Sequence, residues 1–137
     1  MMTAEQLVAL AREARSRSYC PYSAYAVGAA LLCEDGTVYQ GCNVENAAYG
    51  PSVCAERVAV FKAVSEGKRS FAAIAVAGGR AGEEPAGIFP PCGVCRQVLR
   101  EFCSPELPVY LATAEGDFEG HTLGELLPLS FSNADMN

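Results

Sequence analysis

Four residues of this sequence combine types and spacing that could do chemistry: Cys54, Glu56, Cys92 and Cys95. Three thiolates can hold a zinc ion and leave its fourth tetrahedral position open for water, whereas a structural zinc ion has four protein ligands. A carboxylate two residues from the first thiol is well placed to move protons to and from that water. We therefore expect the three cysteines to bind one Zn²⁺ per chain and Glu56 to be the catalytic acid and base.

Two predicted helices would bring these side chains together. Cys92 and Cys95 are three residues apart, so they share one face of a helix predicted over residues 92–102. Two prolines precede Cys92 and favour a helix start there, and Cys54 begins a helix predicted over residues 54–66. The positive ends of both helix dipoles favour thiolate over thiol, which is the form that zinc requires.

Three thiolates leave one excess negative charge around Zn²⁺, which would weaken the metal as a Lewis acid. Arg57 directly follows the Cys-Ala-Glu motif, and Arg96 directly follows Cys95. A guanidinium that donates to thiolate sulfurs would offset the excess charge, and we expect Arg57 to do so. In the alternative, both arginines are solvated on helix surfaces.

Other uses of the cysteines remain open. Cys92-x-x-Cys95 alone could be a thioredoxin-like redox pair, although the upstream Cys-Ala-Glu motif argues against it. A structural zinc site would need a fourth ligand, for which the candidates are Cys20, Cys33, Cys42, Cys103 and His121. Because none of these stands in a second paired motif, we expect the four cysteines to be small buried hydrophobic residues and His121 a surface loop residue.

The composition limits the partners. The 137 residues are enough for one domain, which we place at 1–137. A net charge of −6 without a cluster of Lys and Arg argues against a nucleic-acid polymer, whose phosphates require a basic surface. It permits a small uncharged substrate.

The seven cysteines indicate a reducing environment. Charged residues interrupt the apolar positions of the first 17 residues, so we expect no secretory signal. No apolar run approaches the roughly 18 residues of a membrane span, so we expect no membrane partner. An odd number of cysteines also cannot pair completely. We therefore expect a cytoplasmic protein whose thiols serve a metal or catalysis.

The remaining pattern predicts an α/β fold. We expect helices at 3–18 and 122–127 in addition to the two above, and strands at 26–33, 38–42, 71–77 and 107–113. Thr3 is the expected N-cap of the first helix, and residues 78–91 are an expected loop. Residues 71–77 are apolar on both faces, which suits a central strand covered by helices on each side. The predicted fold is a three-layer α/β/α domain with a central mixed β-sheet.

With these motifs the chain resembles the small homotetrameric cytidine deaminases, over most of its length from Tyr19 to about Phe131. The resemblance is carried by Pro-Tyr-Ser at 21–23, Val-Gly-Ala-Ala at 27–30, Gly-Cys-Asn-Val-Glu-Asn-Ala at 41–47, Cys-Ala-Glu-Arg at 54–57, Pro-Cys-Gly-Val-Cys-Arg-Gln at 91–97 and Glu-Leu-Leu-Pro at 125–128. It implies hydrolysis of cytidine and 2′-deoxycytidine to the uridines and ammonia, with a role in pyrimidine salvage.

The resemblance also implies roles for substrate-binding residues. Asn43 and Glu45 would bind the ribose 3′-hydroxyl, and the backbone N–H of Ala55 would bind the base carbonyl. Tyr25, which stands where the family usually carries Phe, would pack beside the substrate. In a homotetramer three further residues would reach a neighbouring subunit's substrate: Ala47, Tyr49 and Phe131.

Three competing hypotheses involve the same motifs. Blasticidin S deaminases share the zinc motifs but lack the Asn-x-Glu and Cys-Ala-Glu-Arg pairing, so Asn43 and Arg57 favour cytidine. Deaminases of polymeric nucleic acid are disfavoured by the acidic balance. A catalytically silent zinc module would not require a carboxylate at Glu56.

Overall fold

In the computed structural model, which describes residues 2–136, five strands form one mixed sheet in the order β2-β1-β3-β4-β5. Only β3 and β4 pair in parallel; the neighbouring strands are antiparallel. The strands are β1 (Tyr25–Cys33), β2 (Val38–Cys42), β3 (Phe71–Arg80), β4 (Pro108–Ala112) and β5 (Phe118–Thr122). The α-helices are α1 (Ala4–Ala14), α2 (Ala55–Ser65), α3 (Gly93–Phe102) and α4 (Leu123–Leu126), and 3₁₀ turns cover Arg15–Arg17, Ala114–Gly116 and Asn133–Met136.

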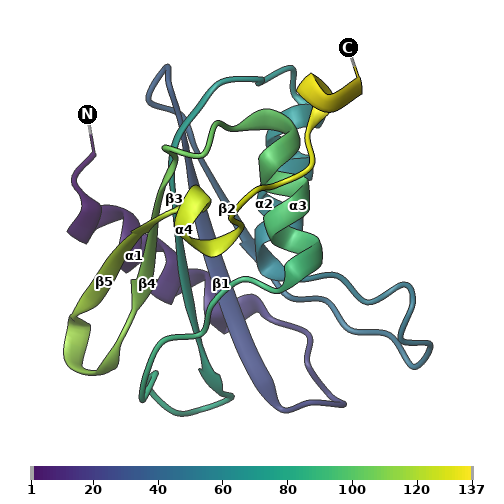
Figure 1. The fold of residues 1–137 in the computed structure, drawn as a ribbon. Coiled ribbons are helices and arrows are strands. Elements are labelled where there is room, and N and C mark those ends of the chain that lie inside the picture. Colours follow the sequence, from purple (N-terminus) through teal and green to yellow (C-terminus); the bar gives the residue numbers. More distant parts are fainter. Residues whose placement is uncertain (1, 137) are drawn as a thin grey trace.

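Helices cover both faces of the sheet (Figure 1). On one face, α1 buries Leu7, Val8 and Ala11 against alternate residues of β1 and β3. On the other face, α2 and α3 pack on the intervening residues, which include Leu31, Ile74 and Val76. Both central strands are therefore apolar on their two faces, and the predicted three-layer α/β/α arrangement is confirmed.

The first helix begins where its sequence predicts. The Thr3 side chain accepts a hydrogen bond from the backbone N–H of Gln6, and the Gln6 side chain accepts one from the N–H of Thr3. This reciprocal capping satisfies two backbone donors that the first helical turn leaves free. The helix ends at Ala14, because residues 15–17 tighten into a 3₁₀ turn instead of continuing to residue 18 as expected.

The predictions that a loop begins at residue 78 and that His121 lies in a loop are wrong. β3 continues through Gly78 and Gly79 to Arg80, because these residues pair with the start of β1. Residues 118–122, for which no strand was predicted, form the edge strand β5 beside β4. His121 is consequently a strand residue, with its ring held between Glu119 and Glu125, and not a loop residue.

A glycine allows α2 to approach the sheet closely. A Cβ atom at Gly41 in β2 would lie 2.4 Å from the backbone oxygen of Ala55 and 2.6 Å from the backbone nitrogen of Ala59. The first turns of α2, which carry Glu56 and Arg57, can rest on β2 only because residue 41 has no side chain.

We expect Gly41→Ala to lower the free energy of unfolding by roughly 1–3 kcal/mol, because the new methyl group forces α2 away from β2. Chemical denaturation measures this change. Gly50→Ala is the matched control, since a Cβ there meets nothing within 4 Å, and it should change stability by less than about 0.5 kcal/mol. Equal effects of the two substitutions would contradict the close approach.

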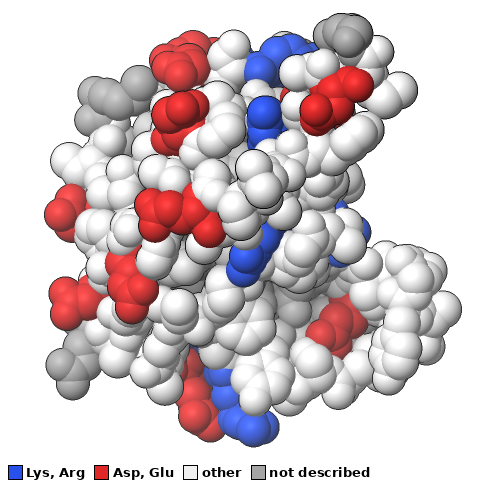
Figure 2. Space-filling model, viewed as in Figure 1, with Lys and Arg blue, Asp and Glu red and all other residues white. Residues whose placement is uncertain are grey.

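The surface carries scattered charges. On the face drawn in Figure 2, acidic side chains are spread over the left of the view, and the Lys and Arg side chains form no broad patch. Among residues 2–136, no helix has both the length and the apolar character needed to cross a membrane.

Candidate metal centre and active site

The three predicted thiol ligands lie together. The Sγ atoms of Cys54 and Cys92 are 3.7 Å apart, those of Cys92 and Cys95 are 3.5 Å apart, and all three lie within 4.8 Å of one another. Zinc–sulfur bonds of about 2.3 Å in a tetrahedron place sulfur atoms roughly 3.8 Å apart. The cluster therefore fits a zinc ion.

The starts of two helices position the thiols. Cys54 is the N-cap residue of α2 and Cys92 that of α3, both with extended backbone, while Cys95 lies in the first turn of α3. Within the described residues, neither N-cap thiol bonds to the N–H groups of its own helix. The sulfur atoms are thus free to point at one another, next to two positive helix ends.

The cluster has three members and one open side. Among residues 2–136, it is the only group of three or more Cys, His, Asp or Glu side chains close enough to share a metal, so none of the five candidate fourth ligands joins it. Cys95 is buried, Cys54 half-buried and Cys92 exposed. Of the other four thiols, Cys33 and Cys103 are buried as expected, whereas Cys20 and Cys42 are only half-buried.

Glu56 is a buried carboxyl group beside this cluster. It is 3% exposed, and its Oε1 atom has no hydrogen-bond partner among the described residues. Burial, together with the charge of the nearby Cys54 thiolate, raises its pKa to about 7. A carboxyl group with this pKa can both take up and release a proton near neutral pH.

Arg57 contacts the thiols, as its position in the motif predicts. Its Nη2 atom donates to Cys54 Sγ at 3.5 Å. Hydrogen bonds from Cys95, Arg57 and Cys92 lower the pKa of Cys54 to about 5, so this sulfur is a thiolate at neutral pH. The shared hydrogen bond with Cys54 and burial raise the pKa of Cys95, which keeps its proton when no metal is bound.

Arg96 has a different task. Its Nε atom donates to the carbonyl of Pro91 at 2.7 Å, and Nη1 donates to the carbonyl of Leu126. The side chain therefore fastens the segment before Cys92 and the end of α4 to α3. Neither arginine is simply solvated.

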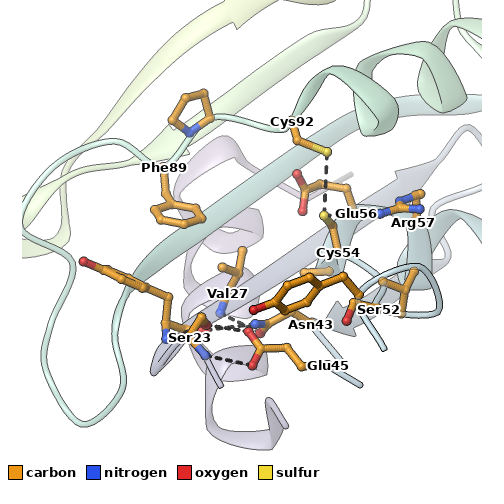
Figure 3. A pocket seen from close by; sticks show the side chains of 15 residues that line it. Ser23, Val27, Asn43, Glu45, Ser52, Cys54, Glu56, Arg57, Phe89 and Cys92 are labelled. Carbon is orange, nitrogen blue, oxygen red and sulfur yellow. Dashed lines mark hydrogen bonds between the residues drawn. The ribbon is translucent and has the colours of Figure 1, made fainter. Parts of the chain in front are cut away.

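A pocket of about 420 Å³ opens beside the thiols (Figure 3). Its lining includes nine predicted site residues: Tyr25, Asn43, Glu45, Tyr49, Cys54, Ala55, Glu56, Arg57 and Cys92. The thiols and Glu56 form one end, Asn43 and Glu45 the opposite polar end, and Val27 lies between them.

The polar end is held by its own hydrogen bonds. Asn43 accepts from the backbone N–H of Val27 at 2.9 Å and donates to the carbonyl of Tyr25 at 2.8 Å. Glu45 Oε1 accepts from the backbone N–H groups of Tyr22 and Ser23, and its Oε2 accepts from the Ser23 hydroxyl. These bonds lower the pKa of Glu45, so the carboxylate stays charged and fixed.

Three predicted site residues do not line the pocket: Ala47, Phe131 and the buried thiol ligand Cys95. Ala47 is exposed, and Phe131 is 60% exposed on the segment after α4, where its carbonyl accepts from Gln97 Nε2 at 2.9 Å. Tyr49 reaches the rim but is 85% exposed. Conversely, six lining residues were not predicted: Ser23, Val27, Ser52, Val53, Phe89 and Pro90. Phe89 and Pro90 immediately precede the Pro-Cys motif, which is the signal that could have revealed them.

We expect zinc binding to release protons, because Cys95 carries a proton without metal and zinc binds thiolates. Each proton released makes the zinc affinity rise about tenfold per pH unit. Calorimetric titration at pH 7 in buffers of different ionisation enthalpy measures the number released. At least one proton per zinc is expected, and a buffer-independent heat would contradict the protonation state assigned to Cys95.

Comparison with known proteins places this site in a family. Residues 1–111 match the family model described as the cytidine and deoxycytidylate deaminase zinc-binding region. The chain belongs to this deaminase family. The matched residues contain Cys54, Glu56, Cys92 and Cys95, so the predicted family and the zinc site are consistent with each other.

Relatives in the deaminase family align over nearly the whole chain. A cytidine deaminase of Sporosarcina psychrophila is 52% identical over 99% of this chain and 96% of its own length, and one of Halalkalibacterium halodurans is 48% identical over 99% of both. The crystal structure of a cytidine deaminase from Burkholderia pseudomallei has a TM-score of 0.87 and 48% identity, covering 95% of this chain and all of that one.

Proposed function

We propose that this protein hydrolyses cytidine and 2′-deoxycytidine to uridine and 2′-deoxyuridine with release of ammonia, in pyrimidine salvage. The observation that carries the proposal is the buried carboxyl group of Glu56, whose Oε1 atom has no hydrogen-bond partner among the described residues, beside a cluster of three thiols at the end of a pocket. A closed structural site would have neither the open side nor the carboxyl group. The full-length cytidine deaminase relatives support the same reaction.

Cys54, Cys92 and Cys95 would hold the zinc ion. When bound, zinc supplies a Lewis acid and makes a water molecule acidic enough to serve as the nucleophile near neutral pH. Arg57, which donates to Cys54, compensates part of the negative charge of the thiolates.

Glu56 moves the protons. Its carboxylate takes a proton from water and delivers it to N3 of the base, which activates C4 for attack. The hydroxide left from that water bonds to C4, and Glu56 takes the proton of the new C4 hydroxyl. It delivers this second proton to the amine as the C4–N bond breaks, so that ammonia leaves and the uridine carbonyl forms. A pKa near 7 suits both directions, because neither the acid nor the base form is strongly preferred at neutral pH.

The opposite end of the pocket would orient the nucleoside. Asn43 retains one N–H and one acceptor lone pair after its bonds to β1, and Glu45 retains acceptor capacity on Oε2. These groups would bind the ribose 3′-hydroxyl, which both donates and accepts. The N–H of Ala55, at the start of α2, would bind the base carbonyl, and Tyr25 would pack beside the substrate.

Assembly into a homotetramer would complete the site. Tyr49, Leu129 and Phe131 are large apolar residues that are each at least 60% exposed. We propose that Ala47, Tyr49 and Phe131 reach the substrate of a neighbouring subunit in a cytoplasmic enzyme. Light scattering coupled to gel filtration should give four times the chain mass, and a monomer would contradict the assembly.

An absorbance assay tests the reaction. Cytidine and deoxycytidine should lose ultraviolet absorbance when mixed with the zinc-loaded protein, while cytosine and cytidine monophosphate report whether ribose and phosphate matter. No absorbance change at one zinc per chain would instead favour a silent zinc module. Activity without metal that is lost on alkylation of Cys92 would favour a dithiol redox protein.

A further inference from the structure

The ring of Phe89 packs against β3 at Gly78, where the strand has no side chain. A Cβ atom at Gly78 would lie 2.4 Å from Cγ, 2.6 Å from Cδ1 and 2.7 Å from Cβ of Phe89. The phenyl ring therefore occupies the space that a side chain at residue 78 would fill. Gly78 pairs with Val27, another residue of the pocket, so the ring is seated on the strands beside the pocket.

A second contact, with Tyr25, also holds the ring of Phe89. The rings of Tyr25 and Phe89 stack with their centroids 6.0 Å apart and their planes 27° apart. The guanidinium carbon of Arg80 lies 5.3 Å from the centre of the Tyr25 ring. A row of three side chains, Arg80–Tyr25–Phe89, thus joins the end of β3, the start of β1 and the loop that leads to Cys92.

Phe89 lies on the side of the pocket where one edge of the substrate base is expected. In Figure 3, Phe89 stands on the opposite side of the pocket from Cys54 and Glu56. Under the proposed function, C4 of the base faces the thiols and N3 faces Glu56, with the base carbonyl at Ala55. The remaining edge of the pyrimidine, C5 and C6, then faces away from α2 and toward Phe89.

We propose that Phe89 determines substrate specificity at C5 of the pyrimidine: its fixed ring forms the wall that limits the size of a substituent there. This inference rests on the proposed function. A wall held by Gly78 and Tyr25 cannot easily retreat, because the ring fills the space above Gly78 and also stacks on Tyr25. An unsubstituted cytosine base is accommodated, and larger bases are disfavoured.

The test compares cytidine with 5-methylcytidine. We expect Phe89→Ala to raise the ratio of kcat/KM for 5-methylcytidine to kcat/KM for cytidine by roughly tenfold or more, the typical discrimination for one methyl group. Ile88→Ala is the matched control, because Ile88 lies in the same loop, is 42% exposed and does not line the pocket. It should leave the ratio unchanged.

Binding of the products gives a readout that is independent of turnover. Calorimetry should show that Phe89→Ala reduces the ratio of the affinity for uridine to the affinity for 5-methyluridine. Gly78→Ala should act oppositely, since its methyl group displaces the ring into the pocket and weakens binding of 5-methyluridine most. The double variant Gly78→Ala/Phe89→Ala should behave like Phe89→Ala alone, because the clash disappears with the ring.

The outcomes separate the two proposals. A wild-type protein that deaminates neither nucleoside would overturn the proposed function. A wild-type protein that deaminates cytidine, with a ratio in Phe89→Ala within threefold of wild type, would overturn only the role of Phe89. If Phe89→Ala does not fold, the ratio of kcat/KM for 5-methylcytidine to that for cytidine is measured instead in Phe89→Val and Gly78→Ala.

Discussion

Replacing Glu56 by Gln is expected to reduce kcat by at least about 10²–10⁴-fold, the usual contribution of proton transfer by a positioned side chain. Glutamine has nearly the same shape but cannot take a proton from water or pass one to the base. The zinc content and the affinity for uridine should change little, because Glu56 is not among the three ligands. Steady-state kinetics, metal analysis and product binding measure the three quantities.

The same substitution should stabilise the metal-free chain at alkaline pH. Burial raises the pKa of Glu56 from 4.5 to about 7, so ionising it costs folding stability, and this stability is present below pH 4.5 and lost as pH rises through 7. The corresponding free energy is about 3 kcal/mol. Denaturation of the zinc-free proteins at pH 5 and pH 8 should therefore show the gain of Glu56→Gln growing with pH.

Glu101→Gln is the matched control, since Glu101 is exposed on α3 and lies outside the pocket. It should alter neither kcat nor the pH dependence of stability. A Glu56→Gln protein with kcat within tenfold of wild type and one zinc per chain would contradict the role assigned to Glu56.

Replacing Cys92 by Ser is expected to remove the metal and with it the activity. Altering groups that merely orient ligands costs about 10–100-fold in metal affinity, so losing one of three ligands should cost more. Cys92 is the exposed member of the cluster, and its replacement therefore disturbs packing least. Metal analysis after dialysis against a weak chelator should find little zinc, with turnover falling in proportion.

Cys42→Ala provides the comparison for this variant. Cys42 is also a free, partly accessible thiol, but it lies in β2 outside the cluster. It should retain one zinc per chain and near wild-type turnover. Full zinc occupancy in Cys92→Ser would show that the metal is held elsewhere.

The thiol cluster could be predicted because its geometry is local. Cys92 and Cys95 share one helix face by spacing alone, and Cys54 precedes Glu56 at the start of the other helix. Bringing the two helix starts together required only that α2 and α3 lie on the same face of the sheet. The unpartnered Oε1 of Glu56, in contrast, depends on what surrounds the carboxyl group and is visible only in the structure.

Other features depend on pairing between distant segments. Gly78 and Gly79 are typical of a loop, yet β1 supplies the hydrogen bonds that extend β3 through them. None of residues 118–122 is buried, and only Phe118 among them is a large apolar residue, so they lack the apolar alternation that marks a strand. Phe89 became a pocket residue through the missing side chain of Gly78, a complementarity between residues eleven positions apart that no periodicity records.

Because the zinc ligands belong to the N-caps and first turn of two separate helices, with Cys54 and Cys92 38 positions apart, the ion can bind only a chain in which both helices are docked. A ligand that binds the native but not the unfolded state stabilises by mass action, by about 4 kcal/mol at a thousandfold excess over its dissociation constant. The folding equilibrium of this chain is thereby linked to free zinc, and its melting temperature should rise with the concentration of free zinc.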